Sequence, residues 1–298
     1  MDARLAVIMH HGERNDERSA GREDNVNINF VDKRTTCETV PTIAVRGGVV
    51  TQATRVVAEE VAVAFSYGGS SHAVMMATPD DLVDFAVGFS LTEGLIGAAS
   101  DIESIEIVRD AIGVDVQLSL VADVEEKLRA RRRHMMGPVG CGLCGIESLE
   151  QAVRQTPSVA AAPLTITPAD IATAVASLAD RQVLNHATRA VHGAGFYVPG
   201  QRLAMVREDV GRHNALDKLC GAVIASGTTG ASGAVTVTSR LSIEMIQKAG
   251  ILGSPIIIAI SAPTAYAIRA ANEAGMTLIA VARGEEFEIF THAHRVIL

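Results

Sequence analysis

The last hundred residues alternate between short apolar stretches and longer amphipathic stretches, and this order restricts the possible folds more than any other feature of the chain. Strands are expected at residues 202–206, 234–238, 255–260, 276–282 and 287–291, and helices at 212–224, 242–249 and 264–274, the last two ended by Gly250 and Gly275. A βαβαβα order of this kind predicts a mostly parallel sheet with helices on both faces. We therefore expect an α/β fold with a three-layer αβα domain over residues 151–298.

The preceding region alternates with the shorter period of strands and is expected to form a smaller, strand-rich α+β region over residues 41–133. Gly68-Gly69 separates two such stretches and predicts a hairpin turn. A helix is expected to start with Thr78 as N-cap and Pro79 in the first turn, and to end at Gly94. Two strands and a helix ending in "LRARRRH" should follow.

Two segments are expected to lack fixed structure. Residues 1–40 are polar, mixed in charge and poor in periodicity, which predicts a mobile N-terminal tail. Residues 134–150 contain "GPVGCGLCG", in which glycines surround Cys141 and Cys144 and predict a mobile Cys-x-x-Cys loop.

Composition excludes several classes of protein. The chain has 26 basic and 34 acidic residues and a net charge of −8, which argues against binding to nucleic acid or to an anionic membrane surface. No apolar run reaches the roughly 18–20 residues that a membrane helix needs, and the N-terminus lacks the features of a signal peptide. Four cysteines are too few for a disulfide scaffold, so a cytoplasmic protein is expected.

Polar residues cluster where the predicted strands of the C-terminal half end and its helices begin. The clusters are "REDVGRHNALDK", "SRLSIE" and "SAPT". Open α/β sheets bind ligands at this edge, where helix N-termini favour phosphate. A phosphate-binding pocket is thus predicted, with these candidate residues: Arg207, Arg212, His213, Ser239, Arg240 and Ser261. In the alternative, Ser242 and Ser261 only cap helices, and the arginines pair with Glu208, Asp209 and Glu244.

The segment "EDVGRHNALDK" carries more polar residues than a solvated helix face requires, which favours a functional role. Cys220, just after it, falls on the expected buried stripe of the helix and is interpreted as a core thiol. His192 lies in "VHGAG", where glycines would permit close approach of a ligand, although an ordinary histidine at the end of a strand fits equally well.

The cysteine pair allows three interpretations. A structural zinc site needs four ligands, but there is no second Cys-x-x-Cys, and the zinc deaminase signature of H-x-E followed by P-C-x-x-C is absent. A redox pair would be expected at a strand-to-helix turn rather than among glycines. Sulfur transport needs an accessible thiolate on a flexible segment, and the upstream cations of the basic run would favour the thiolate: Arg129, Arg131, Arg132, Arg133 and His134. The same cations could instead stabilise the C-terminus of a helix.

Several segments together resemble the formate dehydrogenase accessory sulfurtransferases, the FdhD family. These are "TPDDLVDFAVGFSLTEGLI", "CGLCG", "REDVGRHNALDK", "SRLSIEMIQKAG" and "SAPTAYAIRAANEAGMTLIAVAR", and the resemblance covers about residues 55–298. The stretch "ATRAVHGAG" before and after His192 and the first fifty residues depart from the pattern of the family.

The resemblance implies a specific activity. Members take sulfur from a cysteine desulfurase as a persulfide and pass it to the molybdenum bis-guanine-dinucleotide cofactor of formate dehydrogenase, which they bind as a substrate without holding a metal of their own. The persulfide position corresponds to Cys141, with Cys144 as an auxiliary or resolving thiol. The cofactor-contacting segment near the C-terminus corresponds to Phe287, Glu288, Ile289, Phe290, Thr291 and His292.

The resemblance also implies a homodimer and a C-terminal domain similar in fold to cytidine deaminases. The expected function is that of a sulfurtransferase with a cysteine persulfide intermediate. The alternative is a chaperone that holds the molybdenum cofactor and docks on formate dehydrogenase without transferring sulfur. A zinc-dependent nucleobase deaminase is the third possibility.

Overall fold

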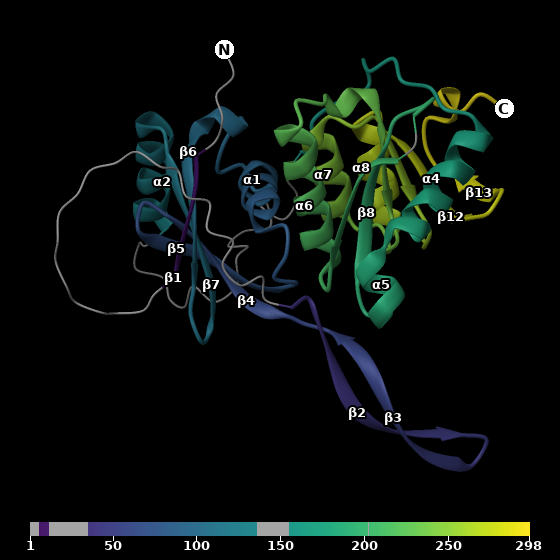
Figure 1. Cartoon of the computed structure of the whole chain (residues 1–298). Coiled ribbons are helices and arrows are strands. Elements are labelled where there is room, and N and C mark those ends of the chain that lie inside the picture. Colours follow the sequence, from purple (N-terminus) through teal and green to yellow (C-terminus); the bar gives the residue numbers. More distant parts are fainter. Residues whose placement is uncertain (1–5, 12–34, 136–154, 202) are drawn as a thin grey trace.

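A computed structural model describes residues 6–11, 35–135, 155–201 and 203–298. The chain forms an N-terminal half, a protruding hairpin and a C-terminal half (Figure 1). Most of the predicted loop at 134–150, including both of its cysteines, lies outside the described residues. In the part of the chain that is described, no helix is long and apolar enough to cross a membrane.

The N-terminal half is a five-stranded sheet in the order β1-β6-β7-β4-β5, covered by two helices. Its elements are β1 (Ala6–His11), β4 (Val61–Tyr67), β5 (Ser70–Ala77), α1 (Leu82–Thr92), the 3-10 turn η1 (Ala99–Asp101), β6 (Ile102–Arg109), β7 (Gly113–Leu120) and α2 (Ala122–Met135). The hairpin turn at Gly68 and Gly69 is confirmed, since both glycines have φ in the left-handed region, 56° and 75°.

Two predictions for this half are corrected by the structure. Residues 6–11 were expected to be mobile, but they form β1 and pair in parallel with β6, which supplies the hydrogen-bonding partner that the sequence of the segment does not reveal. Helix α1 starts after Asp81 and not after Thr78. Thr78 cannot act as its N-cap because the N–H and hydroxyl of Thr78 already bind Asp209 and Val210 in the other half.

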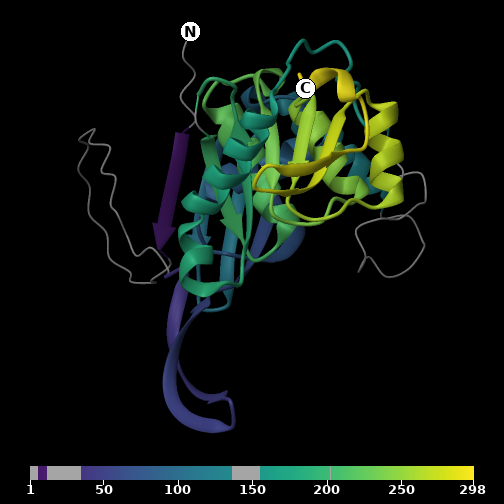
Figure 2. The ribbon, with the colours of Figure 1, turned by 90° about the vertical axis from the view of Figure 1, so that its right-hand side faces the viewer.

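The hairpin consists of β2 (Cys37–Arg46) and β3 (Val49–Ala58), joined at Gly47 and Gly48. Among the described residues the two strands pair only with each other, and they form a curved ribbon that projects away from the body of the molecule (Figures 1 and 2). Its first residues were also expected to belong to the mobile tail. They are ordered here because every residue of β2 has a partner on β3.

The C-terminal half contains a six-stranded sheet in the order β13-β12-β11-β10-β8-β9. Its elements are α4 (Pro168–Arg181), α5 (Val183–Thr188), β8 (His192–Tyr197), β9 (Leu203–Asp209), α6 (Arg212–Ala225), η2 (Gly230–Ser232), β10 (Ala234–Val237), α7 (Ile243–Leu252), β11 (Ile256–Ala259), α8 (Ala265–Glu273), β12 (Thr277–Arg283), β13 (Glu286–Ile289) and η3 (Ala293–Arg295). The predicted order of strands and helices over the last hundred residues is confirmed, with boundaries shifted by a few residues.

The expectation of a mostly parallel sheet is confirmed only in part. Strands β9, β10, β11 and β12 run in one direction, but β8 and β13 run in the opposite direction, so the pairs β8–β10, β8–β9 and β12–β13 are antiparallel. The reason is that β8 and β9 form a hairpin, and β8 inserts between β9 and β10. Strand β9 therefore lies one position further from β10 than a βαβ connection would place it.

Helix α7 also differs from its prediction, because it ends at Gly253, with φ at 85°, and not at Gly250. Gly250 lies inside the helix, where a Cβ atom would come within 2.5 Å of the Thr156 side chain. Close packing, and not termination of the helix, therefore explains this glycine.

Three layers are present in the C-terminal half, as predicted. Helices α6, α7 and α8 share one apolar core with the sheet, and α4 packs on its opposite face in a second core. The likeness to cytidine deaminases stays a prediction, as do the domain boundaries at residues 133 and 150.

Helices α1 and α6 join the two halves through a close crossing (Figure 1). A Cβ atom on Gly88 would lie 1.7 Å from the carbonyl oxygen of Asp217, and one on Gly221 would lie 1.9 Å from that of Asp84. Glycine at both positions lets the two backbones touch, so this contact fixes how the halves sit against each other.

Candidate functional site

Backbone hydrogen bonds between neighbouring strands of the C-terminal sheet bring together the polar clusters that were predicted to form a pocket. The N–H of Thr238 donates to the carbonyl of Gly193, and the N–H of Ile260 donates to that of Val237. The start of β8 therefore lies beside the ends of β10 and β11. His192 pairs in register with Asp209 at the end of β9. The predicted meeting of these strand ends at one edge of the sheet is confirmed.

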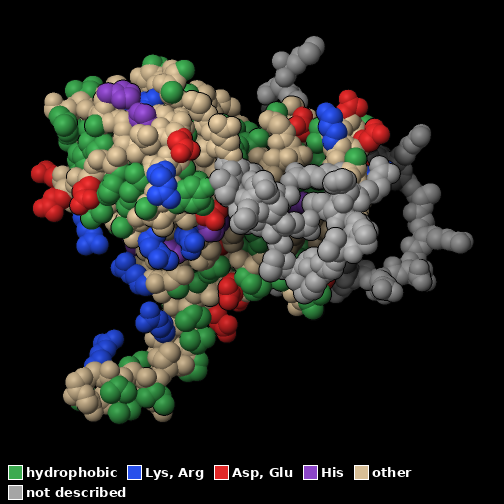
Figure 3. All heavy atoms as spheres, turned by 180° about the vertical axis from the view of Figure 1, so that it is seen from behind, with side chains coloured by type: hydrophobic (Ala, Val, Ile, Leu, Met, Phe, Trp, Pro, Cys, Tyr) green, Lys and Arg blue, Asp and Glu red, His purple; other side chains and the backbone are tan. Residues whose placement is uncertain are grey.

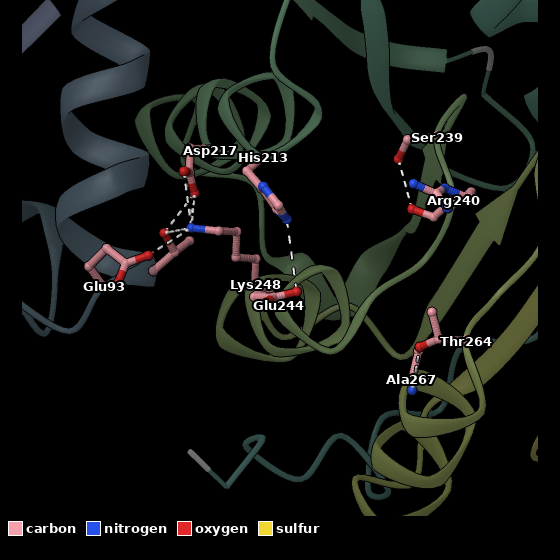
Figure 4. Close-up of polar contacts among 10 residues, drawn as sticks. Glu93, His213, Asp217, Ser239, Arg240, Glu244, Lys248, Thr264 and Ala267 are labelled. Carbon is pink, nitrogen blue, oxygen red and sulfur yellow. Dashed lines mark hydrogen bonds and ion pairs between the residues drawn. The ribbon is translucent and has the colours of Figure 1, made fainter. Parts of the chain in front are cut away.

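Three helices begin at this edge, α6 after β9, α7 after β10 and α8 after β11. Thr264 caps α8, since its Oγ1 accepts a hydrogen bond from the N–H of Ala267. Ser239 is buried and its Oγ donates to the carbonyl of Arg240, while the Arg240 side chain is exposed. Figure 4 shows Ser239 and Arg240 near the first turn of α8. The N–H of Thr264 donates to the carbonyl of Leu241, so the exposed Arg240 is one residue away from a contact with the N-cap of α8, a combination that suits a phosphate group.

Ser261 follows β11 and contacts a strained residue. Its carbonyl accepts a hydrogen bond from the N–H of Val281, which has φ at 55° at an irregularity in the pairing of β12 with β13. A β-branched residue rarely adopts this conformation, which costs of order 1–3 kcal/mol. Such strain persists where surrounding structure requires it, and binding sites are a common setting. No feature of the local sequence indicated Val281.

Two histidines at this edge, His192 and His213, have pKa values below the ordinary value, partly because of Arg212. Burial and the charge of Arg212 lower the pKa of His192, against the opposing effect of Asp209. Burial, Arg212 and Lys248 likewise lower the pKa of His213. The Nε2 atom of His213 is 3.9 Å from Glu244 and makes no hydrogen bond with the described residues (Figure 4). Both rings are therefore neutral near pH 7 and could gain a proton beside an anion.

Lys and Arg side chains are also visible together on the lower part of the C-terminal half and along the hairpin (Figure 3). The net charge of the whole chain is −8, so this concentration is local. A basic region on an acidic protein favours one anionic ligand at a defined place over general binding to polyanions.

Much of the dense polar motif after β9 has a structural role that the sequence did not reveal. Lys218 Nζ lies 2.7 Å from Asp209 Oδ2, with both side chains fully buried, and donates to the carbonyl of Thr78. Asn214 Nδ2 donates to Asp209 Oδ1 and to the carbonyl of Met76. These residues hold the segment before α1 and so connect the two halves.

A second buried network lies beside it. Lys248 Nζ is 2.8 Å from Asp217 Oδ1 and 3.1 Å from Glu93 Oε1, and it also donates to Thr92 Oγ1 (Figure 4). Burial alone would lower the pKa of Lys248, but the charges of Asp217 and Glu93 outweigh it and raise that pKa. The network joins α6, α7 and the end of α1. Sequence reasoning missed Lys248 because its partners lie 31 and 155 residues away.

Arg207 was expected to face a ligand, but it pairs with the N-terminal half. Its Nε donates to Asp84 Oδ2 at 2.8 Å, and Asp81 lies 3.5 Å from the same nitrogen. Glu208 accepts hydrogen bonds from the N–H groups of Leu184 and Asn185 at the start of α5. Arg207 thus has an acidic partner within the protein, as in the alternative interpretation, but the partner is Asp84 and not one of the three carboxylates that the alternative named.

The segment from Phe287 to His292 does not lie at the candidate site as a whole. Because β13 runs antiparallel to β12, Glu286 lies beside Arg283 near the site edge, while Thr291 binds Leu278 and Met276 near the opposite edge. The structure therefore places Phe287 and Glu288 closer to the other candidates than Thr291 and His292. His292 Nε2 contacts the carbonyl of Asn272 at the end of α8.

The cysteines fall into two groups. Cys141 and Cys144 lie outside the described residues. Cys220 is fully buried, as predicted for a core thiol, and burial raises its pKa, which disfavours the reactive thiolate. Cys37 is half-buried at the start of β2. Within the described part of the chain, no cluster of three potential metal ligands occurs.

The geometry defines a two-part α/β protein. Its C-terminal sheet has a candidate anion-binding edge, and buried ion pairs hold this half against the strand-rich N-terminal half. The chain belongs to the FdhD/NarQ family, whose model matches residues 58–297. The predicted family resemblance is thereby confirmed.

Individual relatives agree with this assignment. A protein from Agrobacterium fabrum named sulfur carrier protein FdhD is 61% identical over 255 residues, which are 86% of this chain and 94% of the relative. A protein of the same name from Brucella abortus is 54% identical, over 83% of this chain and 91% of the relative.

The fold matches a solved structure as well. A crystal structure described as a formate dehydrogenase accessory protein from Desulfotalea psychrophila aligns with a TM-score of 0.70 and 25% identity, covering 88% of this chain and all of the other. This likeness extends over both halves of the chain.

Proposed function

We propose that this protein is a cytoplasmic sulfur carrier that delivers sulfur needed for formate dehydrogenase activity. The observation that carries the proposal is the family assignment together with relatives at up to 61% identity that are named sulfur carriers. The anion-binding edge of the C-terminal sheet gives this role a place to hold a phosphate-bearing acceptor.

We place the sulfur on Cys141, the position that the family resemblance implies for the persulfide. Its thiolate attacks the terminal sulfur of a persulfide on a cysteine desulfurase, which forms Cys141–S–S⁻ and releases the thiolate of the desulfurase. Attack of Cys144 on the Cys141 sulfur then forms a Cys141–Cys144 disulfide and releases HS⁻, the form of sulfur that a metal binds as a ligand. A cellular thiol reductant restores both thiols. Each step balances in atoms and electrons, and each needs a thiolate.

The proposed acceptor is the molybdenum bis-guanine-dinucleotide cofactor, bound as a substrate. Its phosphates are matched by the exposed Arg240, the half-buried Arg212 and the N-terminus of α8. Protonation of His192 or His213 would add positive charge when the anion arrives. Phe287 and Glu288 lie at the nearer end of β13 and are proposed to contact the same ligand. Thr291 and His292 are proposed to contribute only through a part of the cofactor that reaches the other edge of the sheet.

The decisive experiment is mass spectrometry of the 137–150 peptide after the intact protein is incubated with a cysteine desulfurase and cysteine. A carrier gains one sulfur on this peptide, and a reductant removes it. A non-catalytic chaperone of the cofactor gains none, whereas it still binds guanine nucleotides. Cys220 serves as an internal control because its buried thiol should remain unmodified.

A further inference from the structure

Arg189 follows the last residue of α5 in a conformation that an arginine rarely adopts. Its φ of 57° and ψ of 28° lie in the left-handed region, and its N–H donates to the carbonyl of Asn185. The side chain is exposed and makes no hydrogen bond or ion pair with the described residues. The left-handed conformation costs an L-residue free energy that glycine would not lose. This turn therefore keeps an exposed cation at a position where glycine would be more stable.

Gln182, at the other end of the same helix, has a buried amide without a partner. The residue is 3% exposed, and its Nε2 makes no hydrogen bond with any described residue. A Cβ atom on Gly193 would lie 2.5 Å from this Nε2, so the amide packs against the start of β8. Buried donors are nearly always paired in native proteins, and a donor without an acceptor destabilises the structure that contains it. Helix α5 thus has an unfavourable feature at each end.

Helix α5 lies at the edge of the sheet that carries the candidate site. Figure 1 shows α5 at the lower end of the C-terminal half, where Figure 3 shows Lys and Arg side chains together. Glu208 pairs with Gly193 in the sheet and accepts hydrogen bonds from two N–H groups in the first turn of α5. Thr238 also bonds to Gly193, and Arg240 follows it by two residues. The fold therefore brings Arg189 and Arg240 to one edge from two separate segments.

A diphosphate group fits this arrangement better than a single phosphate. Its two phosphates carry separate charged oxygens, so guanidinium groups from different segments can each bind one of them. Strain in a free protein persists at binding sites because the ligand uses the residues concerned, and Arg189 has strain of this kind. A ligand oxygen beside Gly193 would also supply the acceptor that Gln182 lacks among the described residues.

We propose that Gln182 and Arg189 form a subsite for the second phosphate of a diphosphate group whose first phosphate binds at Arg240 and the N-terminus of α8. The inference rests on the proposed function, because each guanine dinucleotide of the proposed acceptor contains such a group. Arg189 donates to the phosphate oxygens through its guanidinium, and Gln182 donates through Nε2. The subsite makes the protein discriminate nucleoside diphosphates from monophosphates, and it lowers the stability of the protein without ligand.

Calorimetry of the full chain with guanosine diphosphate and guanosine monophosphate tests the proposal. The unmodified protein should bind the diphosphate about tenfold more tightly. Arg189→Gly and Gln182→Met should each lose most of this preference and bind the monophosphate as the unmodified protein does. Arg240→Ala should instead weaken binding of both nucleotides, because it removes a contact with the first phosphate. Lys127→Ala, on the exposed face of α2 in the N-terminal half, should change neither affinity.

Thermal melting without nucleotide separates a binding role from a structural one. Arg189→Gly and Gln182→Met should each melt about 2 °C higher than the unmodified protein, because glycine relieves the strain and methionine has no amide to leave unpaired. Arg189→Asn, which also tolerates the left-handed region, should lose the preference for the diphosphate as Arg189→Gly does.

Equal affinity of the unmodified protein for the two nucleotides overturns the proposal, and so does a preference that survives in the variants. Variants that melt at a lower temperature and bind both nucleotides more weakly assign these residues a structural role and overturn it too. If the unmodified protein binds neither nucleotide, the subsite and the proposed acceptor site are both wrong. Sulfur loading of the 137–150 peptide is measured separately, so the role as a sulfur carrier is tested independently of the subsite.

Discussion

Lys218 and Asp209 form an ion pair with 2.7 Å between Nζ and Oδ2, and both side chains have no exposed surface. Both also bind Thr78, since Lys218 donates to its carbonyl and Asp209 accepts from its N–H. One buried pair therefore fixes the segment that leads into α1 and ties the two halves of the protein together.

Removal of one partner of this pair should be strongly destabilising. Lys218→Met leaves Asp209 buried without its counter-charge, and we expect a loss of about 3–5 kcal/mol in the free energy of unfolding, measured by urea denaturation. Glu125→Gln is the control because its pair with Arg129 is partly exposed, so the substitution should change stability by less than about 1 kcal/mol. Equal effects of the two substitutions would contradict a central structural role for Lys218.

The helix crossing should not tolerate a single methyl group. Gly88→Ala would place its Cβ 1.7 Å from the carbonyl oxygen of Asp217, so α1 and α6 must separate. We expect the free energy of unfolding to fall by about 1–3 kcal/mol, the usual cost of overpacking. The amides of α1 should also be less protected in hydrogen exchange. Gly97→Ala, whose nearest contact would be a side-chain atom at 3.6 Å, should be nearly neutral. Unchanged stability of Gly88→Ala would show that the halves can shift freely.

Arg240 should contribute directly to binding of a phosphate-bearing ligand. Its side chain is exposed beside the N-terminus of α8, so Arg240→Ala should weaken guanosine diphosphate binding by about 1–3 kcal/mol in calorimetry without loss of stability. Lys127→Ala removes the same charge from the exposed face of α2 and should leave the affinity unchanged. If both variants bind equally well, the pocket lies elsewhere.

Binding of the same nucleotide should strengthen as the pH falls from 8 to 6. Burial and Arg212 lower the pKa of His192, so the ring is neutral in the free protein, and an anion nearby favours the protonated form. Binding is then coupled to proton uptake, with a change of up to about tenfold in affinity per pH unit for each proton.

His192→Gln should flatten this pH profile. His294→Gln is the matched control, since His294 is exposed in η3 near the opposite edge of the sheet and should keep the slope. Calorimetry over the pH series distinguishes these outcomes. A profile that stays equally steep in His192→Gln would place the titrating group elsewhere, with His213 as the next candidate.

The two cysteines of the glycine-rich segment should differ in their effects. Cys141→Ser should abolish activation of formate dehydrogenase in cells that lack the native protein, because a hydroxyl cannot carry a persulfide at neutral pH. Cys144→Ser should keep the persulfide on the 137–150 peptide and slow its release, with partial loss of activation. Full complementation by Cys141→Ser would rule out its role as the carrier.

The successful predictions concern features that depend only on residues close together in the chain. The turn at Gly68 and Gly69 requires two residues with positive φ, a conformation that glycine adopts without steric cost. Periodicity likewise located most elements of the C-terminal half. Each of these depends on contacts within a few residues, which the sequence displays directly.

The predictions that failed depend on partners far away in the chain. Thr78 has the chemistry of an N-cap, yet its polar groups are bound by residues about 130 positions later. Gly250 could end a helix, but Thr156 packs against it and the helix continues. Insertion of β8 beside β10 turned a parallel pattern into a mixed sheet, because strand pairing is chosen by the whole sheet.

The sequence by itself determined the family, the polar motifs and the edge of the sheet at which they meet. Only the tertiary structure decided which polar residues are free to bind a ligand. Asp209, Asn214 and Lys218 satisfy one another inside the protein, whereas Arg240 remains exposed at the site edge. A buried charge must be paired to remain in the interior and an exposed one need not be, so burial separates the residues that hold the fold from those that can meet a substrate.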